Sequence, residues 1–555
     1  IACARTALGW PHAAIVVRRH RSGASLAFEA PLDQLYAATE VNEWAWSHAL
    51  CCACASENEQ TQADRDFAPG HAAVCDEDSA LQTLRALAAA EASPALLALR
   101  DAAAARGLPF LPDDELVSIG SGDGSQAWPA AALPAPSEVD WDRLHAVPTA
   151  LVTGSNGKTT TVRLVAAMAR AHGWPTAYSC TDGVFFDGAA LESGDFSGPT
   201  GARTALRQPQ AQAAVLETAR GGLLRRGLVV KRADVAVVTN ISADHFGEYG
   251  IHDLDDLAAA KLTVARAIDG EGLLVLNAND PVLVRQSMAL DCPRGWFASD
   301  YDADALAAHR GQQGATCGVR DGRLRMSWQG IEHDLGEVAA MPLTLGGRAA
   351  YNVANAAAAV LAALALGIAP ETVARTLSCF GSTHEDNPGR LQHWRFGGLQ
   401  VYVDYAHNPD GLRGVLQALD AGHRDGRLAV LLGHAGNRGD ADLREVATTV
   451  AAFRPELVVL KDIGGYERGR AAGEVASIMR AALQEAGLDD AGIETRLDEV
   501  EAARRPLAWA RDGDLIVLPV HELEARAQVV ALLDTLRARK WRPGMPLPPK
   551  QGPEG

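Results

Sequence analysis

Residues 149–172 read TALVTGSNGKTTTVRLVAAMARAH, and their pattern sets the class of fold that we expect. An apolar run precedes a turn with two glycines, and apolar residues at helical spacing follow, which predicts strand, loop and helix in that order. Gly154 and Gly157 allow the backbone to turn successive N–H groups toward one anion, and the helix N-terminus adds positive charge. The predicted phosphate-binding loop comprises Gly154, Ser155, Asn156, Gly157, Lys158, Thr159 and Thr160.

Within this loop, Lys158 is expected to reach the β- and γ-phosphates of a nucleotide, and the Thr159 hydroxyl to take a magnesium position. Only Ser155 and Asn156 separate the two glycines, whereas the usual P-loop has four residues before its Gly-Lys pair. The competing interpretation is a tight strand-to-helix turn without a ligand. The strand before and the helix after favour phosphate binding.

Further buried strands, QAAVLE, ADVAVVTN and GLLVLN, alternate with helices after this loop, which predicts a parallel sheet covered on both faces. A second alternating series (LQVYVDY, LAVLLG, ELVVLK, DLIVLPV) predicts another doubly wound unit. We therefore expect an α/β protein, with a P-loop-containing central domain and a Rossmann-like C-terminal domain behind a small α+β N-terminal domain. The expected ranges are 1–143, 144–383, 384–543 and a disordered tail at 544–555.

Composition narrows the classes of function. The 555 residues carry a formal net charge of −18, which argues against a nucleic-acid groove because phosphate backbones need a basic surface. No stretch approaches the roughly 20 apolar residues of a bilayer span, and the N-terminus does not resemble a signal peptide. Nine cysteines are too few for a disulfide scaffold. We expect a soluble cytoplasmic protein that binds neither nucleic acid nor membrane.

One segment of the N-terminal region gathers four cysteines and a histidine. They are Cys51, Cys52, Cys54, His71 and Cys75. A zinc site would use such ligands, but their spacing is irregular and the segment between them is polar and acidic. We favour free thiols over a metal.

The loop TGSNGKTT resembles that of the Mur ligase superfamily, and later motifs follow in that superfamily's order. They are VLETARGG with Glu217, TNISADH with His245, LAAAKL with Lys261, LNANDP, YNVANA, PGR with Arg390, and VDYAHNPDG. The resemblance covers about residues 147 to 520. It implies an ATP-dependent ligase that activates a carboxylate as an acyl phosphate and couples it to an amine.

Within the superfamily, VLETARGGLLRRGL, TDGVFFDG and SGDFSGPTGAR most resemble the C-terminal half of cyanophycin synthetase. That half attaches arginine to aspartate side chains. Residues before the loop resemble the synthetase's N-terminal domain and the lead-in to its ATP-grasp domain. A Pro/Ala linker then runs directly into the phosphate loop, so we expect the ATP-grasp domain to be missing. Without it the chain would not build an aspartate backbone alone.

The resemblance also implies metal ligands. Glu217 and Thr159 would hold one Mg²⁺, and His245 would help to place a second. Lys261 matches a position that is carbamylated in many relatives, where carbon dioxide turns a cationic amine into an anionic metal ligand. Lys158, Glu217, His245 and Lys261 are thus the expected catalytic residues. Their alternatives are ordinary surface, capping or solvated helix residues.

Nucleotide contacts are implied further along the chain. Asn352 and Asn355 match helix residues that contact adenine, and Arg390 and Asp404 match groups that close over the phosphates and ribose. His407 lies beside them in the sequence, next to Asn408. The asparagines could instead satisfy backbone groups, and His407 could bond within its own turn. The arginines of ARGGLLRR (219–226) would either meet an anionic substrate or form a solvated helix end.

Three functions remain from the sequence alone. The first is a cyanophycin-synthetase-like amide ligase whose partners are ATP and an amino acid or peptide with a carboxylate acceptor. The second is a muramyl- or folate-type ligase. The third is a non-catalytic nucleotide-binding partner of a full-length synthetase. Homo-oligomers and association with a synthetase are both open.

Overall fold

The computed structural model describes residues 1–20, 23–53, 77–243 and 246–549. The chain divides into two compact units, Ile1–Ala146 with Phe246–His252, and Val147–His245 with Asp253–Gly555. The domain boundaries expected from the sequence remain predictions.

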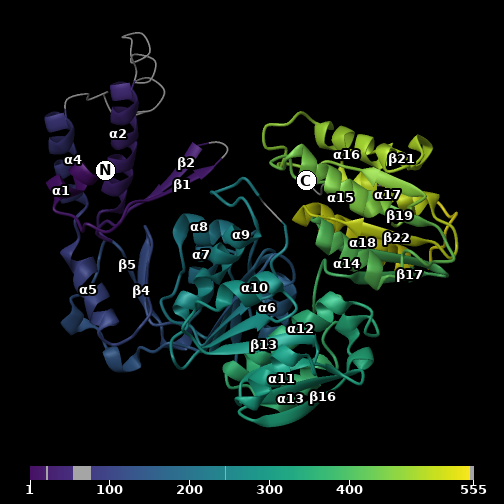
Figure 1. The fold of residues 1–555 in the computed structure, drawn as a ribbon, viewed down its shortest axis with the longest axis horizontal. Coiled ribbons are helices and arrows are strands. Elements are labelled where there is room, and N and C mark those ends of the chain that lie inside the picture. Colours follow the sequence, from purple (N-terminus) through teal and green to yellow (C-terminus); the bar gives the residue numbers. More distant parts are fainter. Residues whose placement is uncertain (21–22, 54–76, 244–245, 550–555) are drawn as a thin grey trace. The chain divides into compact units, whose positions relative to one another are not determined.

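The first unit combines helices with small antiparallel sheets, as expected for an α+β region (Figure 1). Its elements are α1 (Ala2–Leu8), β1 (Val16–His20), β2 (Gly23–Ala27), α2 (Leu35–Ala53), α4 (Glu77–Glu91), α5 (Pro94–Ala104), β3 (Phe110–Pro112), β4 (Leu116–Ile119), η1 (Gly122–Gly124), β5 (Gln126–Pro129), η2 (Pro136–Glu138) and η3 (Trp141–Arg143). Buried Trp10, Val41 and Leu84 belong to one core cluster of α1, α2 and α4. Of the clustered cysteines and histidine, Cys54, His71 and Cys75 lie outside the described residues, as do the side chains of Cys51 and Cys52. The choice between thiols and zinc therefore stays a prediction.

The second unit begins with a mixed sheet of order β16-β15-β14-β13-β12-β11-β6-β10-β7-β8-β9. Its strands are β6 (Thr149–Thr153), β7 (Thr176–Cys180), β8 (Gly183–Phe186), β9 (Ala189–Ser193), β10 (Ala213–Glu217), β11 (Val235–Val238), β12 (Leu273–Asn277), β13 (Arg294–Asp300), β14 (Ala315–Arg320), β15 (Arg323–Trp328) and β16 (Ile331–Glu337). The helices are α6 (Lys158–His172), α7 (Pro199–Leu206), α8 (Arg220–Arg226), α9 (Leu254–Lys261), η4 (Leu262–Ala267), α10 (Pro281–Ser287), α11 (Asp304–Gly311), η5 (Val338–Ala340), η6 (Pro342–Thr344), α12 (Ala350–Ala365) and α13 (Pro370–Leu377). Strands β7, β10, β6, β11, β12, β13 and β14 pair in parallel, which confirms the expected parallel sheet.

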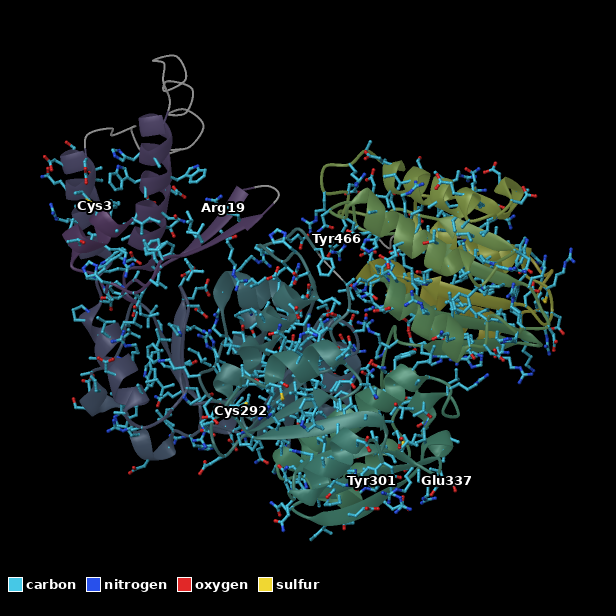
Figure 2. All side chains as sticks on the ribbon, viewed as in Figure 1. Cys3, Arg19, Cys292, Tyr301, Glu337 and Tyr466 are labelled. Carbon is cyan, nitrogen blue, oxygen red and sulfur yellow. The ribbon has the colours of Figure 1, made fainter. Side chains whose placement is uncertain are left out.

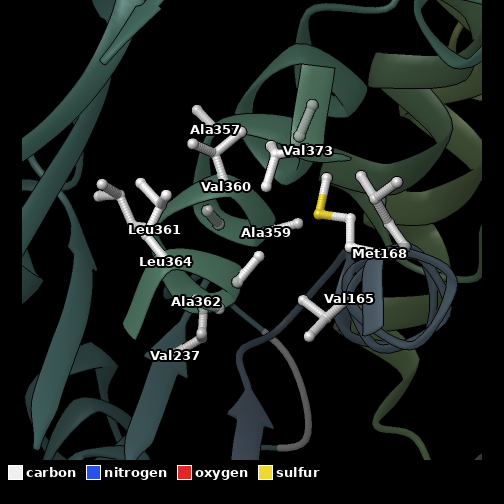
Figure 3. Close-up of a cluster of buried hydrophobic side chains, with 14 of the residues drawn as sticks. Val165, Met168, Val237, Ala357, Ala359, Val360, Leu361, Ala362, Leu364 and Val373 are labelled. Carbon is white, nitrogen blue, oxygen red and sulfur yellow. The ribbon is translucent and has the colours of Figure 1, made fainter. Parts of the chain in front are cut away.

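Helices α6 and α12 pack together against one face of this sheet, over its central strands. Figure 3 shows Val165 and Met168 of α6 facing the apolar side chains of α12, with Val237 of the sheet beneath. Leu361 of α12 is fully buried there. Because parallel strands are covered on both faces, their sequences are nearly continuous apolar runs, which made them recognisable. At the outer strands, the buried ring of Tyr301 (labelled in Figure 2) stacks against Arg310.

The C-terminal region forms a second sheet of order β17-β18-β22-β19-β20-β21, in which β17 alone is antiparallel among the described strands. Its elements are β17 (Gln392–Phe396), β18 (Leu399–Asp404), α14 (Pro409–Ala418), β19 (Leu428–Leu432), α15 (Asp440–Ala451), β20 (Leu457–Leu460), α16 (Glu474–Glu485), η7 (Asp490–Gly492), β21 (Ile493–Thr495), α17 (Glu499–Trp509), β22 (Leu515–Pro519) and α18 (Leu523–Ala538). Apolar clusters lie on both faces, one with α14, α15 and α16 and the other with α17 and α18. This arrangement confirms the expected doubly wound domain.

The first residues of the expected tail contact this domain. Leu547 packs against its second apolar cluster, and Arg504 donates to the Pro548 carbonyl. Residues 550–555 lie outside the described part of the chain. In the described ranges, no helix is both long and apolar enough to cross a bilayer.

Candidate nucleotide and ligase site

The predicted phosphate loop lies between β6 and α6, as the sequence indicated. Gly154 has φ 146° and Gly157 has φ 83°, both in the range that favours glycine. A Cβ on Gly154 would lie 1.8 Å from Thr239 Oγ1, and one on Gly157 would lie 2.1 Å from Asn355 Oδ1. Side chains at either glycine would therefore collide with the segments that enclose the loop.

The segment after β11 holds the loop in shape. Thr239 Oγ1 donates to the Asn156 carbonyl at 2.6 Å, and the Asn156 N–H donates to Asn240 Oδ1 at 2.9 Å. The Ser155 N–H donates to the Asn240 carbonyl, and the Ser155 hydroxyl bonds Ser242. These contacts involve the TNIS part of the TNISADH motif. The motif thus has a structural role in fixing the loop backbone.

Helix α6 starts at Lys158 and presents its N-terminus at the loop, without an acidic residue in its first turn. Half-buried Lys158 directs its ammonium back over the loop, where Nζ donates to the Ser155 carbonyl at 3.1 Å. The free N–H groups and partial positive charge of a helix N-terminus favour an anion. A lysine held against the same turn adds a full positive charge.

Glu217, at the end of β10, meets the first turn of α6. Thr159 Oγ1 donates to Glu217 Oε2 at 2.8 Å, and Thr181 Oγ1 donates to Glu217 Oε1 at 2.8 Å. The carboxylate is only 1% exposed. A buried carboxylate between two hydroxyls is the kind of hard oxygen donor set that Mg²⁺ prefers. The residues present therefore fit the expected cation, and Thr159 and Glu217 are its candidate ligands.

Lys261 ends α9 and is 5% exposed, which excludes the interpretation as a solvated helix residue. Its Nζ donates to the Gly154 carbonyl at 2.7 Å, so the amine reaches the phosphate loop. His245 lies outside the described residues, and its metal role stays a prediction. Among the described residues, no group of three or more His, Cys, Asp or Glu side chains is placed to hold a metal. The second magnesium and the carbamate stay predictions.

The two helix asparagines are buried near the start of α12. Asn352 Nδ2 donates to the Leu343 carbonyl at 3.0 Å, and Asn355 Nδ2 donates to Asn352 Oδ1 at 3.1 Å. Asn352 thus satisfies a backbone group, as the alternative interpretation expected, whereas Asn355 bonds a side chain. The position of Asn355 beside Gly157 nevertheless places this pair against the phosphate loop. Their contact with adenine stays a prediction.

Two residues of the C-terminal region contact the same loop, Arg390 and Asn408. Arg390 Nη2 lies 3.4 Å from Thr159 Oγ1, and its guanidinium stacks 4.3 Å from the Tyr405 ring centroid. Asn408 Nδ2 donates to Asn156 Oδ1 at 2.9 Å and so joins α14 to the loop.

Asp404 and His407 have more local contacts. The Asp404 carboxylate accepts from the Leu391 and Ala406 N–H groups, each at 2.7 Å, and burial raises its pKa. It shapes the segment that carries Arg390. His407 Nδ1 lies 3.2 Å from the Tyr405 carbonyl, within its own turn. Contacts of both residues with nucleotide stay predictions.

A buried charged group supports the His407 turn, and sequence reasoning missed it. Lys461, at the end of β20, is fully buried and contacts both Glu499 and His521. His521 Nε2 in turn lies 3.1 Å from the Ala406 carbonyl. Burial, together with Lys461, lowers the pKa of His521 well below its usual value. All three follow strands or begin a helix, but only their convergence in space singles them out.

A second missed group centres on Asp182. Arg163 Nη2 lies 2.8 Å from Asp182 Oδ2, Arg390 Nη2 lies 3.8 Å from the same oxygen, and Arg526 contacts Oδ1. Burial alone would raise the pKa of Asp182, yet the three arginines lower it to about 2. Asp182 belongs to TDGVFFDG, which the sequence offered only as a mark of resemblance.

Family models match both α/β domains. The Mur ligase middle domain matches residues 152–363, and the Mur ligase glutamate ligase domain matches residues 389–519. A UDP-N-acetylmuramoyl-L-alanyl-D-glutamate–2,6-diaminopimelate ligase of Xanthomonas oryzae pv. oryzae is 32% identical over 394 residues, covering 67% of this chain and 72% of that protein. The chain belongs to the Mur ligase family. The family resemblance and the fold class expected from the sequence are thereby confirmed.

Among Mur ligase relatives, the cyanophycin synthetase of Synechocystis sp. is 35% identical over 373 residues, which is 67% of this chain. The chain spans 42% of the length of that synthetase. Between β5 and β6 the described residues hold only the short helices η2 and η3, so no ATP-grasp domain intervenes there. A solved structure of a bifunctional folylpolyglutamate synthase/dihydrofolate synthase with Mn, AMPPNP and L-glutamate bound shares the fold, at 20% identity and TM-score 0.52 over 70% of this chain and 89% of that one.

Proposed function

We propose that this Mur ligase homologue is an ATP-dependent amide ligase, which activates a carboxylate as an acyl phosphate and couples it to an amino acid or peptide amine. The observation that carries the proposal is the Thr159–Glu217 hydrogen bond at the head of α6. It brings a buried carboxylate to a glycine loop, a lysine and a helix N-terminus. This combination suits a nucleoside triphosphate with its cation.

Phosphoryl transfer depends mainly on positioning and on neutralising charge. Lys158 would contact the β- and γ-phosphates, and the N–H groups of Gly157 to Thr160 would face them. Thr159 and Glu217 would hold Mg²⁺, with His245 and Lys261 as candidate ligands of a second ion. Bound there, the cation supplies positive charge beside the phosphate oxygens.

The proposed reaction has two steps. A carboxylate oxygen of the acceptor attacks the γ-phosphorus, the bond to the β-phosphate oxygen breaks, and ADP leaves. The amine nitrogen then attacks the activated carbonyl carbon, loses a proton, and the C–O bond to phosphate breaks. Because water would hydrolyse the acyl phosphate, the reacting atoms need cover. The contacts of Arg390 and Asn408 with the loop support such cover by the C-terminal domain.

The substrate is proposed from relatives alone. Likeness to cyanophycin synthetases favours addition of an amino acid to a side-chain carboxylate of a peptide or polymer. The 72% coverage of a diaminopimelate-adding ligase favours a muramyl peptide as the second candidate. A non-catalytic partner is the third reading, and the filled Lys158 and Glu217 positions count against it.

The first experiment is phosphate release from ATP with Mg²⁺ and bicarbonate, across aspartyl peptides, cyanophycin fragments, muramyl peptides, folates and free amino acids. Mass spectrometry would identify the condensation product. Turnover that depends on one carboxylate–amine pair would support the ligase and name its substrates. Tight ATP binding without stimulation by any pair would favour the nucleotide-binding partner instead.

A further inference from the structure

We propose that Asp182 is a positioning residue that latches the C-terminal domain over the phosphate loop. The inference deepens the proposed function and rests on it for the meaning of closure, but its contacts can be tested without any substrate. The inference rests on one buried carboxylate that binds arginines from the central α/β domain and from the C-terminal α/β domain. Neither the family comparison nor the ligand positions named above assigns Asp182 a role.

The position of Asp182 follows from a tight hairpin. Strands β7 and β8 are antiparallel and pair Cys180 with Gly183, so Thr181 and Asp182 form the connecting turn. The Thr181 hydroxyl and N–H both donate to Glu217, at 2.8 and 3.3 Å. Asp182 points instead to the arginines. Adjacent residues of one turn thus hold the proposed magnesium ligand and the interdomain contact.

The arginines come from different parts of the chain. Arg163 lies on α6, directly after the loop, while Arg390 begins the C-terminal domain and Arg526 lies in the first turn of α18. The side chains of Asp182, Arg163 and Arg526 are 5%, 5% and 7% exposed, and that of Arg390 is 14% exposed. Charges this buried are expensive to separate, because each would then lack its compensating partner. The cluster therefore favours the arrangement in which the two domains touch.

The segment that joins the two domains leaves room for the Arg526 side chain at Gly389. A Cβ on Gly389 would lie 2.7 Å from the Arg526 Cδ and Nη1 atoms. Arg163 Nη1 donates to the Pro388 carbonyl at 3.0 Å, and Asn387 Nδ2 donates to Thr160 Oγ1 at 3.2 Å. The joining segment is thus held against α6 on one side and against α18 on the other. Asp182 is the acceptor common to both sides.

Arg390 connects the Asp182 contact to the proposed reaction site. It is shared between Asp182 and Thr159, the first a carboxylate and the second a proposed metal ligand. Three arginines surround Asp182 beside the phosphate loop, and Arg390 also interacts with Asp404 and Glu217. Asp182 holds these guanidinium groups in place until an anion of the nucleotide competes for them. Removing Asp182 would leave the loop intact but let the C-terminal domain open more often.

The experiment is hydrogen–deuterium exchange on the full chain, without nucleotide and with MgADP, for wild type, Asp182→Asn, Arg526→Gln and the double variant. The Leu391 amide, which donates to Asp404, reports on residues 381–391. We expect Asp182→Asn to raise exchange in that segment roughly tenfold while α6 and β10 stay protected. Arg526→Gln should do the same, and the double variant should add little, because both changes break one contact.

The matched control is Asp334→Asn. Asp334 also binds two arginines, Arg323 at 2.7 Å and Arg325 at 3.3 Å, but all three lie on β15 and β16 of one domain. It should leave residues 381–391 unchanged. Equal exchange in Asp182→Asn and Asp334→Asn, or multiplicative effects in the double variant, would overturn the latch. If Asp182→Asn also exposes α6 and β10, the Arg526→Gln result decides: a rise confined to 381–391 supports the latch, and any other result refutes it.

With turnover established, kinetics supply a second readout. Asp182→Asn should lower kcat about tenfold or more, since small misplacements of reacting groups are costly, and leave ATP affinity nearly unchanged. A loss of ATP affinity without a change in kcat would contradict the latch. Absence of turnover in every variant would count against the proposed function and leave the exchange result to judge the latch.

Discussion

Thr159 and Glu217 are joined by a 2.8 Å hydrogen bond although 58 positions separate them in the chain. Thr159 lies in the first turn of α6, and Glu217 ends β10, the strand that pairs in parallel with β6. The carboxyl ends of neighbouring parallel strands meet at one sheet edge, which is where open α/β folds bind ligands. This relationship gives the candidate site its testable consequences.

Removing the negative charge of Glu217 should weaken metal binding. Glu217→Gln keeps the size of the side chain but loses a hard anionic ligand. We expect the Mg²⁺ concentration for half-maximal ATP turnover to rise about tenfold or more, because one charge-assisted contact is lost. Glu192→Gln is the control, since Glu192 is exposed on β9. Equal Mg²⁺ dependence in the two variants would contradict the ligand assignment.

Lys158 is expected to act on the phosphates. Lys158→Ala should lower ATP turnover about 100-fold, the usual scale for losing one preorganised charge at a reacting oxygen. Lys231→Ala serves as its control because Lys231 is exposed in the same domain. Phosphate release under saturating substrates measures the effect. Turnover within twofold of the Lys231 control would rule out the assignment.

The carbamate on Lys261 is open to a direct test. Depleting bicarbonate should lower activity reversibly if the modified side chain is a metal ligand, and ¹³C-bicarbonate should give a carbamate NMR signal. Lys261→Arg should lose both, since a guanidinium does not form this carbamate. The alternative is the observed contact of the free amine with the Gly154 carbonyl at 2.7 Å. Activity indifferent to bicarbonate in wild type would favour that role.

Packing of α12 against the central sheet should dominate the stability of that domain. Leu361 is fully buried in the cluster of Figure 3, so Leu361→Ala should lower the free energy of unfolding by about 2–5 kcal/mol. Leu191 is 45% exposed on β9, and Leu191→Ala should change the free energy of unfolding by less than about 0.5 kcal/mol. Urea denaturation of both variants measures the difference. Similar midpoints would show that the cluster is not well packed.

The Asp182 cluster predicts a pH dependence. The pKa of Asp182 is about 2, below the ordinary value of 3.8, so its ionised form stabilises the folded state. This contribution is present above about pH 4 and is lost as the pH falls toward the folded pKa. Between pH 5 and 2, measured by urea unfolding, wild type should lose more stability than Asp182→Asn. Parallel curves would show that Asp182 does not titrate with folding.

The sequence alone determined the local pattern. Apolar runs predicted β6, β10, β11 and β12, and the glycines at 154 and 157 predicted the loop, because strand burial and left-handed backbone leave direct marks on neighbouring residues. Ordered motifs then predicted the family that the comparisons confirmed. Contacts of His245, Asn352 and Asp404 with ligands stay predictions.

Only the tertiary structure decided which distant groups share one place. Asp182 and Arg526 are 344 positions apart, and no local periodicity links a hairpin turn to the start of α18. Lys461, Glu499 and His521 likewise meet only where three elements converge. Buried charges leave no repeating mark in a sequence, since each is compensated by a partner that the chain brings from elsewhere. Local chemistry was therefore readable from the chain, while the contacts between the two domains required the fold.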